Sequence, residues 1–309
     1  MIKHETGSLL KRLRVQKDIS LNDLAACAGV SASTISRIEN GKTMPAYKLI
    51  AVLLQKLGYD PSNFAAHFVS KKEQKWQKRQ DEISNLLYTW KTSEAHDLIV
   101  ECENDKEFMQ VKFNEQFVLV SRATIMTNNG EDFDKIMDVL LEAIKINIPT
   151  FSYKYIEDYF ISNIDFRIIN MMAILHDEYG QSDKAINLMM ALKSNVDKHS
   201  VDKAHKGKLY PAIIYNLTKY LGMAGRYRDA VELCDEGIKV CIETGWLVDL
   251  PEIIYNKACC LYDLGEKEEC EKLLTMVYYT CLAYKKYETS EMIKGHAQNR
   301  MDIDFSPKY

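Results

Sequence analysis

The sequence predicts an all-α protein made of a small N-terminal domain and a longer helical repeat array. Only 6 prolines and 13 glycines occur in 309 residues. Long apolar stripes recur at helical spacing, whereas no segment alternates between apolar and polar residues as a half-buried strand does. With 47% hydrophobic and 27% charged residues, the composition is typical of a soluble globular protein that is long enough for more than one core.

Residues 31–41, SASTISRIENG, are typical of a short helix with one buried side. Ser31 can cap its N-terminus, and Gly41 can take a left-handed conformation at its C-terminus. Ile35 and Ile38 lie three residues apart, on one face. A second short helix ends at Gly29 just upstream, so the pair forms a helix, a tight turn and a helix. This geometry lays one helix in the major groove of DNA.

Further helices are predicted around this pair. Residues 6–17 place three leucines inward and the basic residues, Arg14 among them, toward solvent. A helix follows from Pro45, which is tolerated in a first turn, to the stop at Gly58. Another short helix is expected to start at Pro61. Five helices in this span make a small independent domain.

Charge divides the chain unevenly. Residues 1–70 carry nine lysines and arginines against five acidic residues, whereas the whole chain has a net charge of −4. The remainder is therefore acidic. We expect only the N-terminal domain to meet a polyanion such as DNA.

A repeated pattern fills the rest of the chain. In residues 180–185, 225–230 and 265–270, a glycine stands five residues ahead of a small residue, and helical stretches lie on both sides. Weaker copies occur at residues 91–95 and 130–136. The glycine allows a turn, and the small residue lets two helices pack closely. The sequence thus predicts about five helix pairs, which stack into a right-handed superhelix with a concave inner surface.

These motifs resemble known families. With LKRLR, ISLNDLA, GVSASTISRIENGKTMP and LLQKLG in this order, residues 5–69 resemble the Cro/repressor-type (Xre) helix-turn-helix domain. The later repeats resemble degenerate tetratricopeptide repeats. Nearly the whole chain resembles the peptide-pheromone-responsive regulators of the Rgg, PlcR, PrgX, NprR and Rap group, and its helix order is most like the PlcR branch. We therefore expect a DNA-binding domain at 1–69, a basic helical linker at 70–82, and a peptide-binding and dimerisation domain at 83–309.

The helix-turn-helix resemblance also implies which residues contact DNA. Residues 31–40 would be the recognition helix. Arg37 is expected at a base edge, because arginine paired with guanine is the commonest specific contact, although a pair with Glu39 or Asp23 is an alternative. Leu21 departs from the family, where a glutamine that bonds the DNA backbone is common. The expected DNA contacts are Ser31, Ala32, Ser33, Thr34, Ser36, Arg37 and Lys42.

Three asparagines stand at nearly equivalent places in successive repeats. Asn170, Asn216 and Asn256 lie on the first helices of their pairs, and a side-chain amide suits the backbone of an extended peptide because it both donates and accepts. The resemblance implies that they clamp a peptide. Helix packing is the alternative, and it applies equally to the tyrosines nearby. Cationic and aromatic candidates for the same face are Arg122, Arg167, Tyr215, Lys219, Tyr255 and Tyr262.

Other functional classes have little support in the sequence. There is no glycine-rich phosphate loop, nucleophile elbow or HExxH motif, and the 7 histidines are scattered. We expect no enzymatic activity, no cofactor and no metal. The 8 cysteines include no CxxC pair and suggest reduced thiols. The absence of a signal peptide or an apolar span predicts a cytoplasmic protein with no membrane partner.

The sequence thus predicts a homodimeric transcription regulator that reads a palindromic operator on double-stranded DNA and senses a short signalling peptide, as in quorum sensing. Two half-sites are expected because one small domain buries too little DNA contact for high specificity. The alternative is a regulator whose repeats dock a partner protein and bind no peptide. The segment after residue 286 either caps the repeats or trails as a tail, and Met292 and Ile293 favour a helix to about Arg300.

Overall fold

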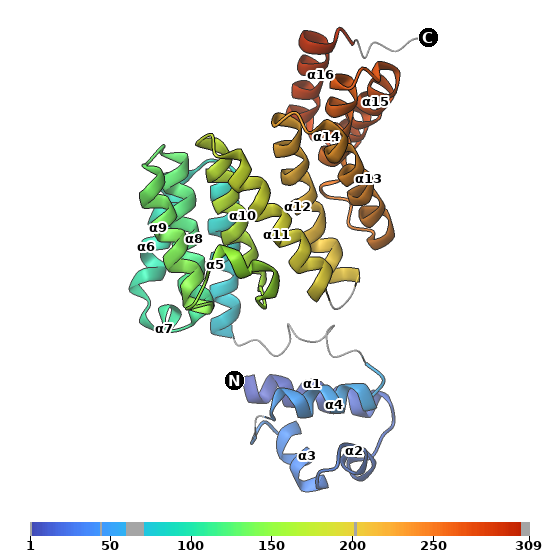
Figure 1. Cartoon of the computed structure of the whole chain (residues 1–309). Helices are drawn as coiled ribbons and strands as arrows, with labels where there is room; N and C mark the ends of the chain where they lie inside the picture. The colour runs from blue at the N-terminus through green and yellow to red at the C-terminus, as the bar shows by residue number, and fades with distance from the viewer. Residues whose placement is uncertain (1, 44, 60–70, 201–202, 304–309) are drawn as a thin grey trace. The chain divides into compact units, whose positions relative to one another are not determined.

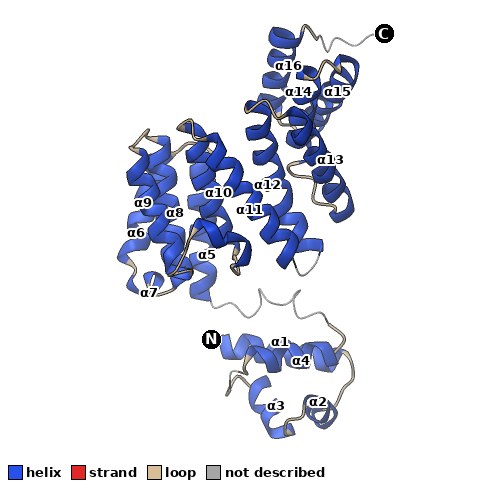
Figure 2. Ribbon diagram, in the orientation of Figure 1, coloured by secondary structure: helices blue, strands red, loops and turns tan. Residues whose placement is uncertain are grey.

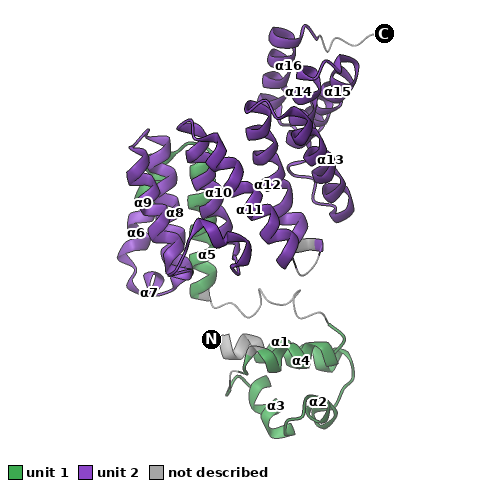
Figure 3. Ribbon diagram, in the orientation of Figure 1, with its two compact units in different colours: residues 1–98 green, residues 99–309 purple. Residues whose placement is uncertain are grey.

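The computed structural model describes residues 2–43, 45–59, 71–200 and 203–303, and within these ranges every regular element is a helix (Figures 1 and 2). The chain forms two compact units, residues 1–98 and residues 99–309 (Figure 3). Boundaries at residues 69 and 82 stay predictions. No helix in the described part of the chain is both long and apolar enough to cross a membrane.

Four helices make up the described part of the helix-turn-helix domain: α1 (Ile2–Gln16), α2 (Leu21–Ala28), α3 (Ala32–Glu39) and α4 (Tyr47–Lys56). Their leucines and isoleucines form one core, in which Leu10, Leu24 and Ile35 are almost fully buried. Ser20 and Ser31 cap α2 and α3, as predicted for Ser31. The fifth helix, predicted to start at Pro61, lies outside the described residues.

The basic stretch after this domain is helical. Helix α5 (Lys71–Tyr88) begins within it, and α6 (Thr92–Asn104) follows after a short turn. Residues 71–82 are therefore helical, and their role as a linker stays a prediction.

The helix pairs of the second unit follow in order: α8 (Lys112–Asn128) with α9 (Phe133–Asn147), α10 (Asn163–Glu178) with α11 (Ser182–His199), α12 (Lys203–Met223) with α13 (Tyr227–Thr244), and α14 (Leu250–Asp263) with α15 (Lys267–Ala283). A short helix α7 (Lys106–Met109) precedes α8, and a 3-10 segment η2 (Tyr153–Asp158) separates α9 from α10. Each helix packs mainly on its neighbours in sequence, as in a repeat array. The predicted tetratricopeptide-like architecture is confirmed.

The turns between paired helices share one backbone conformation. Gly130, Gly180, Gly225 and Gly265 all have positive φ, between 68° and 87°, which glycine adopts without a steric cost. Each glycine is followed by a small or apolar residue that is at most 1% exposed: Ile136, Ala185, Ala230 and Cys270. In the turn between α5 and α6, Trp90 stands in place of the glycine and has φ 59°.

The segment after residue 286 forms helix α16 (Tyr287–Met301) and is not a trailing tail over this range. Its Ile293 and Ala297, followed by Ile303, are buried in one apolar cluster with residues of α14 and α15. The segment therefore caps the array as far as residue 303. The turn before it repeats the earlier pattern, since Lys285 has φ 59° and Ser290, five residues later, is fully buried.

Candidate functional site

Helix α3 exposes a polar N-terminus. The Ser31 hydroxyl accepts a hydrogen bond from the Thr34 backbone N–H at 3.2 Å and lies 2.8 Å from the hydroxyls of Ser33 and Thr34. Ser31 and Ser33 are exposed, and Ala32 and Ser36 are half-buried. Hydroxyls and free N–H groups at a helix N-terminus are suited to phosphate or base contacts.

Arg37 is exposed near the other end of α3, and in the part of the chain that the structure describes its guanidinium has no ion pair. The Glu39 carboxylate, the alternative partner, is instead bonded by Arg14 at 2.7 and 3.0 Å. The exposed Lys42 donates its backbone N–H to the Arg37 carbonyl at 2.8 Å. Two exposed cationic residues therefore lie near this end of α3.

Arg14 corrects the prediction that it faces solvent. Its side chain is 12% exposed and that of Glu39 is 4% exposed, and a third bond runs from Arg14 Nη1 to the Ile19 carbonyl at 2.8 Å. The hydrogen bonds to Glu39 raise the pKa of Arg14. Arg14 thus joins α1 to the end of α3 and fixes the helix that presents Arg37.

Leu21, where many family members have glutamine, packs half-buried against the domain core. It begins α2, whose N-cap Ser20 accepts the backbone N–H of Asp23 at 3.1 Å. The side chain at this position therefore contributes packing and offers no hydrogen bond to DNA.

In the repeat unit the three asparagines connect successive first helices. Asn216 on α12 donates to the Asn170 side-chain oxygen on α10 at 2.9 Å. Asn256 on α14 donates to the Tyr215 carbonyl at 2.9 Å and to the Thr218 hydroxyl at 3.0 Å. These bonds give the asparagines a packing role, which the sequence alone left as an alternative. The Asn256 oxygen and the Asn170 amide N–H groups stay unbonded within the described residues.

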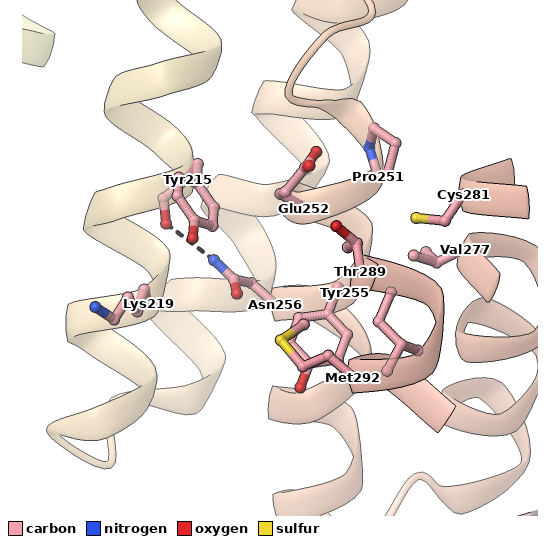
Figure 4. Close-up of a pocket in the computed structure, with 11 residues that line it drawn as sticks. Tyr215, Lys219, Pro251, Glu252, Tyr255, Asn256, Val277, Cys281, Thr289 and Met292 are labelled. Carbon is pink, nitrogen blue, oxygen red and sulfur yellow. Dashed lines mark hydrogen bonds between the residues drawn. The ribbon is translucent and has the colours of Figure 1, made fainter. Parts of the chain in front are cut away.

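A pocket of about 220 Å³ lies beside this row, bounded by α12, α14, α15 and α16 (Figure 4). It brings together four of the nine residues predicted for a peptide site, namely Tyr215, Lys219, Tyr255 and Asn256. The sequence did not predict the other lining residues: Pro251, Glu252, Val277, Cys281, Thr289, Met292 and Ile293. Three of these belong to α16. The spacing of five residues from the turn residue Lys285 to the small residue Ser290 matches the earlier repeats and could have predicted this helix.

The remaining predicted residues lie outside this pocket. Arg122 is bonded to Glu103 at 2.6 and 3.0 Å, so its charge is already compensated. Arg167 on α10 is exposed and has no ion pair among the described residues. Tyr262 donates its hydroxyl to the Arg300 carbonyl at 3.2 Å, which gives it a role in holding α16.

Electrostatics around the pocket are acidic. Burial, and then the nearby charges of Glu252 and Asp249, raise the pKa of Tyr215. Burial followed by the Glu252 charge also raises the pKa of Asp249. Tyr255, whose pKa is raised by burial, bonds His296 of α16 at 2.6 Å from its hydroxyl to Nδ1. Both tyrosines are therefore neutral hydrogen-bonding groups on an apolar wall.

A second pocket of about 380 Å³ lies near η2, lined by Tyr153, His176, Lys184, Asn187 and Leu188. It contains none of the predicted residues. His176 Nδ1 and Lys184 Nζ both contact the Gln181 side-chain oxygen, at 3.0 and 2.8 Å.

The fold is shared with solved bacterial regulators. Bacillus thuringiensis PlcR, in complex with the peptide PapR7 and DNA, is 16% identical and superposes with a TM-score of 0.70 over 94% of this chain and 99% of its own. The Streptococcus dysgalactiae SHP pheromone receptor Rgg2 is 14% identical, with a TM-score of 0.67 over 96% of this chain and 100% of its own. A putative transcriptional regulator from Listeria monocytogenes is 13% identical, with a TM-score of 0.70 over 97% and 99%. No curated protein matches the chain in sequence.

Two family models match the sequence itself. The helix-turn-helix model matches residues 10–64, and the model of the RNPP family C-terminal domain matches residues 129–288. The second match spans more than half of the chain. The protein is therefore a helix-turn-helix transcription regulator of the RNPP family.

Proposed function

We propose that this regulator binds a short signalling peptide in its repeat unit and that the bound peptide alters how a homodimer binds a palindromic operator. The observation that carries the proposal is the pocket in which Tyr215, Lys219, Tyr255 and Asn256 meet. An extended peptide needs such a combination of amide, aromatic and charged groups, because its backbone must be bonded while its side chains are buried. The complexes of PlcR with PapR7 and of ComR with ComS, both also with DNA, support the same kind of ligand.

The pocket also favours a peptide over a docked partner protein. A protein-docking surface would be broad and open, whereas this pocket is bounded on several sides by four helices. Arg167, exposed on α10 with no ion pair among the described residues, supplies a cation for a carboxylate of the peptide.

The proposed dimer follows from the size of the DNA-binding domain. One small domain contacts a single half-site, and two linked copies roughly double the binding free energy. The peptide would act by favouring one arrangement of the two domains. We further propose cytoplasmic residence, where both DNA and an imported peptide are within reach.

Calorimetric titration of the full chain with pooled synthetic peptides of five to eight residues tests the ligand class. Saturable binding by at least one pool is the expected result. If no pool binds, the peptide proposal is wrong, and the docking alternative takes its place.

Selection of DNA from a random duplex library tests the operator. We expect palindromic sequences and a complex with two protein chains. Arg37→Ala should then weaken binding to the selected operator about 10- to 100-fold, as for a base-contacting arginine. Arg12→Ala, an exposed charge on α1, is the matched control. If both variants lose operator affinity equally, Arg37 contributes only general electrostatic attraction to DNA and contacts no base.

A further inference from the structure

We propose that the pocket between α12, α14, α15 and α16 takes one bulky apolar side chain of the peptide and that Glu252 binds an ammonium or guanidinium group beside it. This inference rests on the proposed peptide-binding function and adds the chemistry of the segment that is bound. It is carried by the shape of the pocket, an unbonded carboxylate oxygen and the local balance of charge.

The pocket wall is mostly carbon and sulfur. Much of its lining consists of Pro251 of α14, Val277 and Cys281 of α15, and Met292 of α16 (Figure 4). Ile293 of α16 also lines it. A cavity of about 150 Å³ is enough to hold a benzene ring. At about 220 Å³, this pocket has room for one aromatic or large aliphatic side chain, whose burial would favour binding.

Among the polar groups that line the pocket, the Glu252 carboxylate is only partly hydrogen-bonded. Its Oε1 accepts a hydrogen bond from Lys286 Nζ at 2.8 Å. Its Oε2 is buried and has no hydrogen-bond partner among the described residues. A buried carboxylate oxygen without a partner is costly, so it favours a ligand that brings a donor.

Because Glu252 is a carboxylate, the ligand donor that suits it best is a cationic group. Burial, and after it the nearby charge of Glu252, raises the pKa of Asp249. Lys286 is the cation bonded to Glu252, and Lys219, on the α12 side of the pocket, has Asp177 at 3.8 Å. Lys286 bonds only one oxygen of the Glu252 carboxylate, so an ammonium or guanidinium from the peptide would bond the other and add a second favourable charge contact.

The cation can come from the peptide's N-terminus or from a lysine or arginine side chain, and two peptide libraries separate these sources. Immobilised full-length protein is exposed to random heptapeptides with free N-termini and, separately, to the same library with acetylated N-termini. We expect retained peptides to carry a large apolar residue next to a cation. If the α-amine is the source, enrichment occurs only in the free library. If a side chain is the source, lysine or arginine is enriched in both.

Variants of the pocket identify the residues that are responsible. Glu252→Gln keeps the shape but removes the charge, and should weaken the selected peptides at least tenfold. Glu232→Gln, the same substitution on the exposed surface of α13, should leave their affinity unchanged. Thr289→Phe should fill the pocket and shift selection toward small residues. Met292→Ala, a truncation at a 55% exposed side chain, should shift it toward larger ones even if Thr289→Phe fails to fold.

Three outcomes would overturn the inference. Retained peptides without an apolar residue beside a cation would refute the chemistry assigned to the bound segment. Equal affinities for the wild type and Glu252→Gln would refute the role of Glu252. In both cases peptide binding itself would stand. Retention of no peptide by the wild type would instead refute the proposed function together with this inference.

Discussion

Arg14 and Glu39 form a two-point ion pair inside the helix-turn-helix domain, with Nε to Oε1 at 2.7 Å and Nη2 to Oε2 at 3.0 Å. The two residues are 25 positions apart and belong to α1 and α3. Because both side chains are largely buried, the pair fixes the orientation of α3 relative to α1.

Breaking this pair should destabilise the DNA-binding domain. Arg14→Met or Glu39→Met alone leaves one buried charge without its partner, which costs about 3–5 kcal/mol. The double variant removes both charges and should recover most of that loss. Hydrogen exchange of α1 and α3 in the full chain measures the effect, with Arg12→Met as the surface control. If the stability lost in the double variant equals the sum of the two single losses, Arg14 and Glu39 do not stabilise each other.

Trp90 and Lys285 occupy left-handed turn positions that elsewhere in the array belong to glycine. A side chain there costs about 1–2 kcal/mol, and Trp90 is 73% exposed, so it recovers little by packing. Trp90→Gly and Lys285→Gly should each stabilise the chain by about 1 kcal/mol after the entropy cost of glycine. Calorimetric melting measures the gain, and Ala224→Gly, an exposed turn residue without positive φ, should be destabilising instead. A lower melting temperature for Trp90→Gly would point to an unrecognised role for its ring.

Local patterns predicted the elements of this fold well. The capping serine, the apolar spacing of α3 and the glycine turns depend on residues close in sequence, and each appears where it was expected. Arg14 was misplaced because helical periodicity assigns it a face but cannot reveal that Glu39, 25 residues away, is buried opposite it.

The candidate site was only partly predictable for the same reason. Tyr215 and Asn256 were found because repeats place equivalent residues on one face. Glu252 was missed because its importance depends on Lys286 and on the way α16 closes the pocket. Both are long-range consequences of packing, which no local pattern encodes.

Two histidines should make the repeat unit less stable in mild acid. Burial lowers the pKa of His176 and of His296 below the usual 6.5. The unfolded chain therefore binds more protons than the folded chain as the pH falls through about 6.5, so stability is full above that pH and is lost below it. Melting between pH 7.5 and 5.5 should show a smaller loss in His176→Gln than in the wild type. His96→Gln, at an exposed position on α6, should follow the wild type, and parallel curves for all three proteins would contradict the assignment.

Asn170 and Asn256 allow packing and ligand roles to be separated by one substitution, asparagine to aspartate. Asn256→Asp removes both amide donors, leaving the Tyr215 carbonyl and the Thr218 hydroxyl without them, at a cost of about 1–3 kcal/mol. Asn170→Asp keeps the oxygen that accepts from Asn216, so its melting temperature should stay near that of the wild type.

Peptide binding then distinguishes the two roles. In Asn170→Asp the amide N–H groups, unbonded within the described residues, are lost while the packing bond stays. If Asn170 clamps a peptide, affinity for a selected peptide should fall about tenfold, the cost of a lost hydrogen bond. Unchanged affinity in this variant, measured by calorimetry on protein of unchanged stability, would assign Asn170 to helix packing through its bond with Asn216.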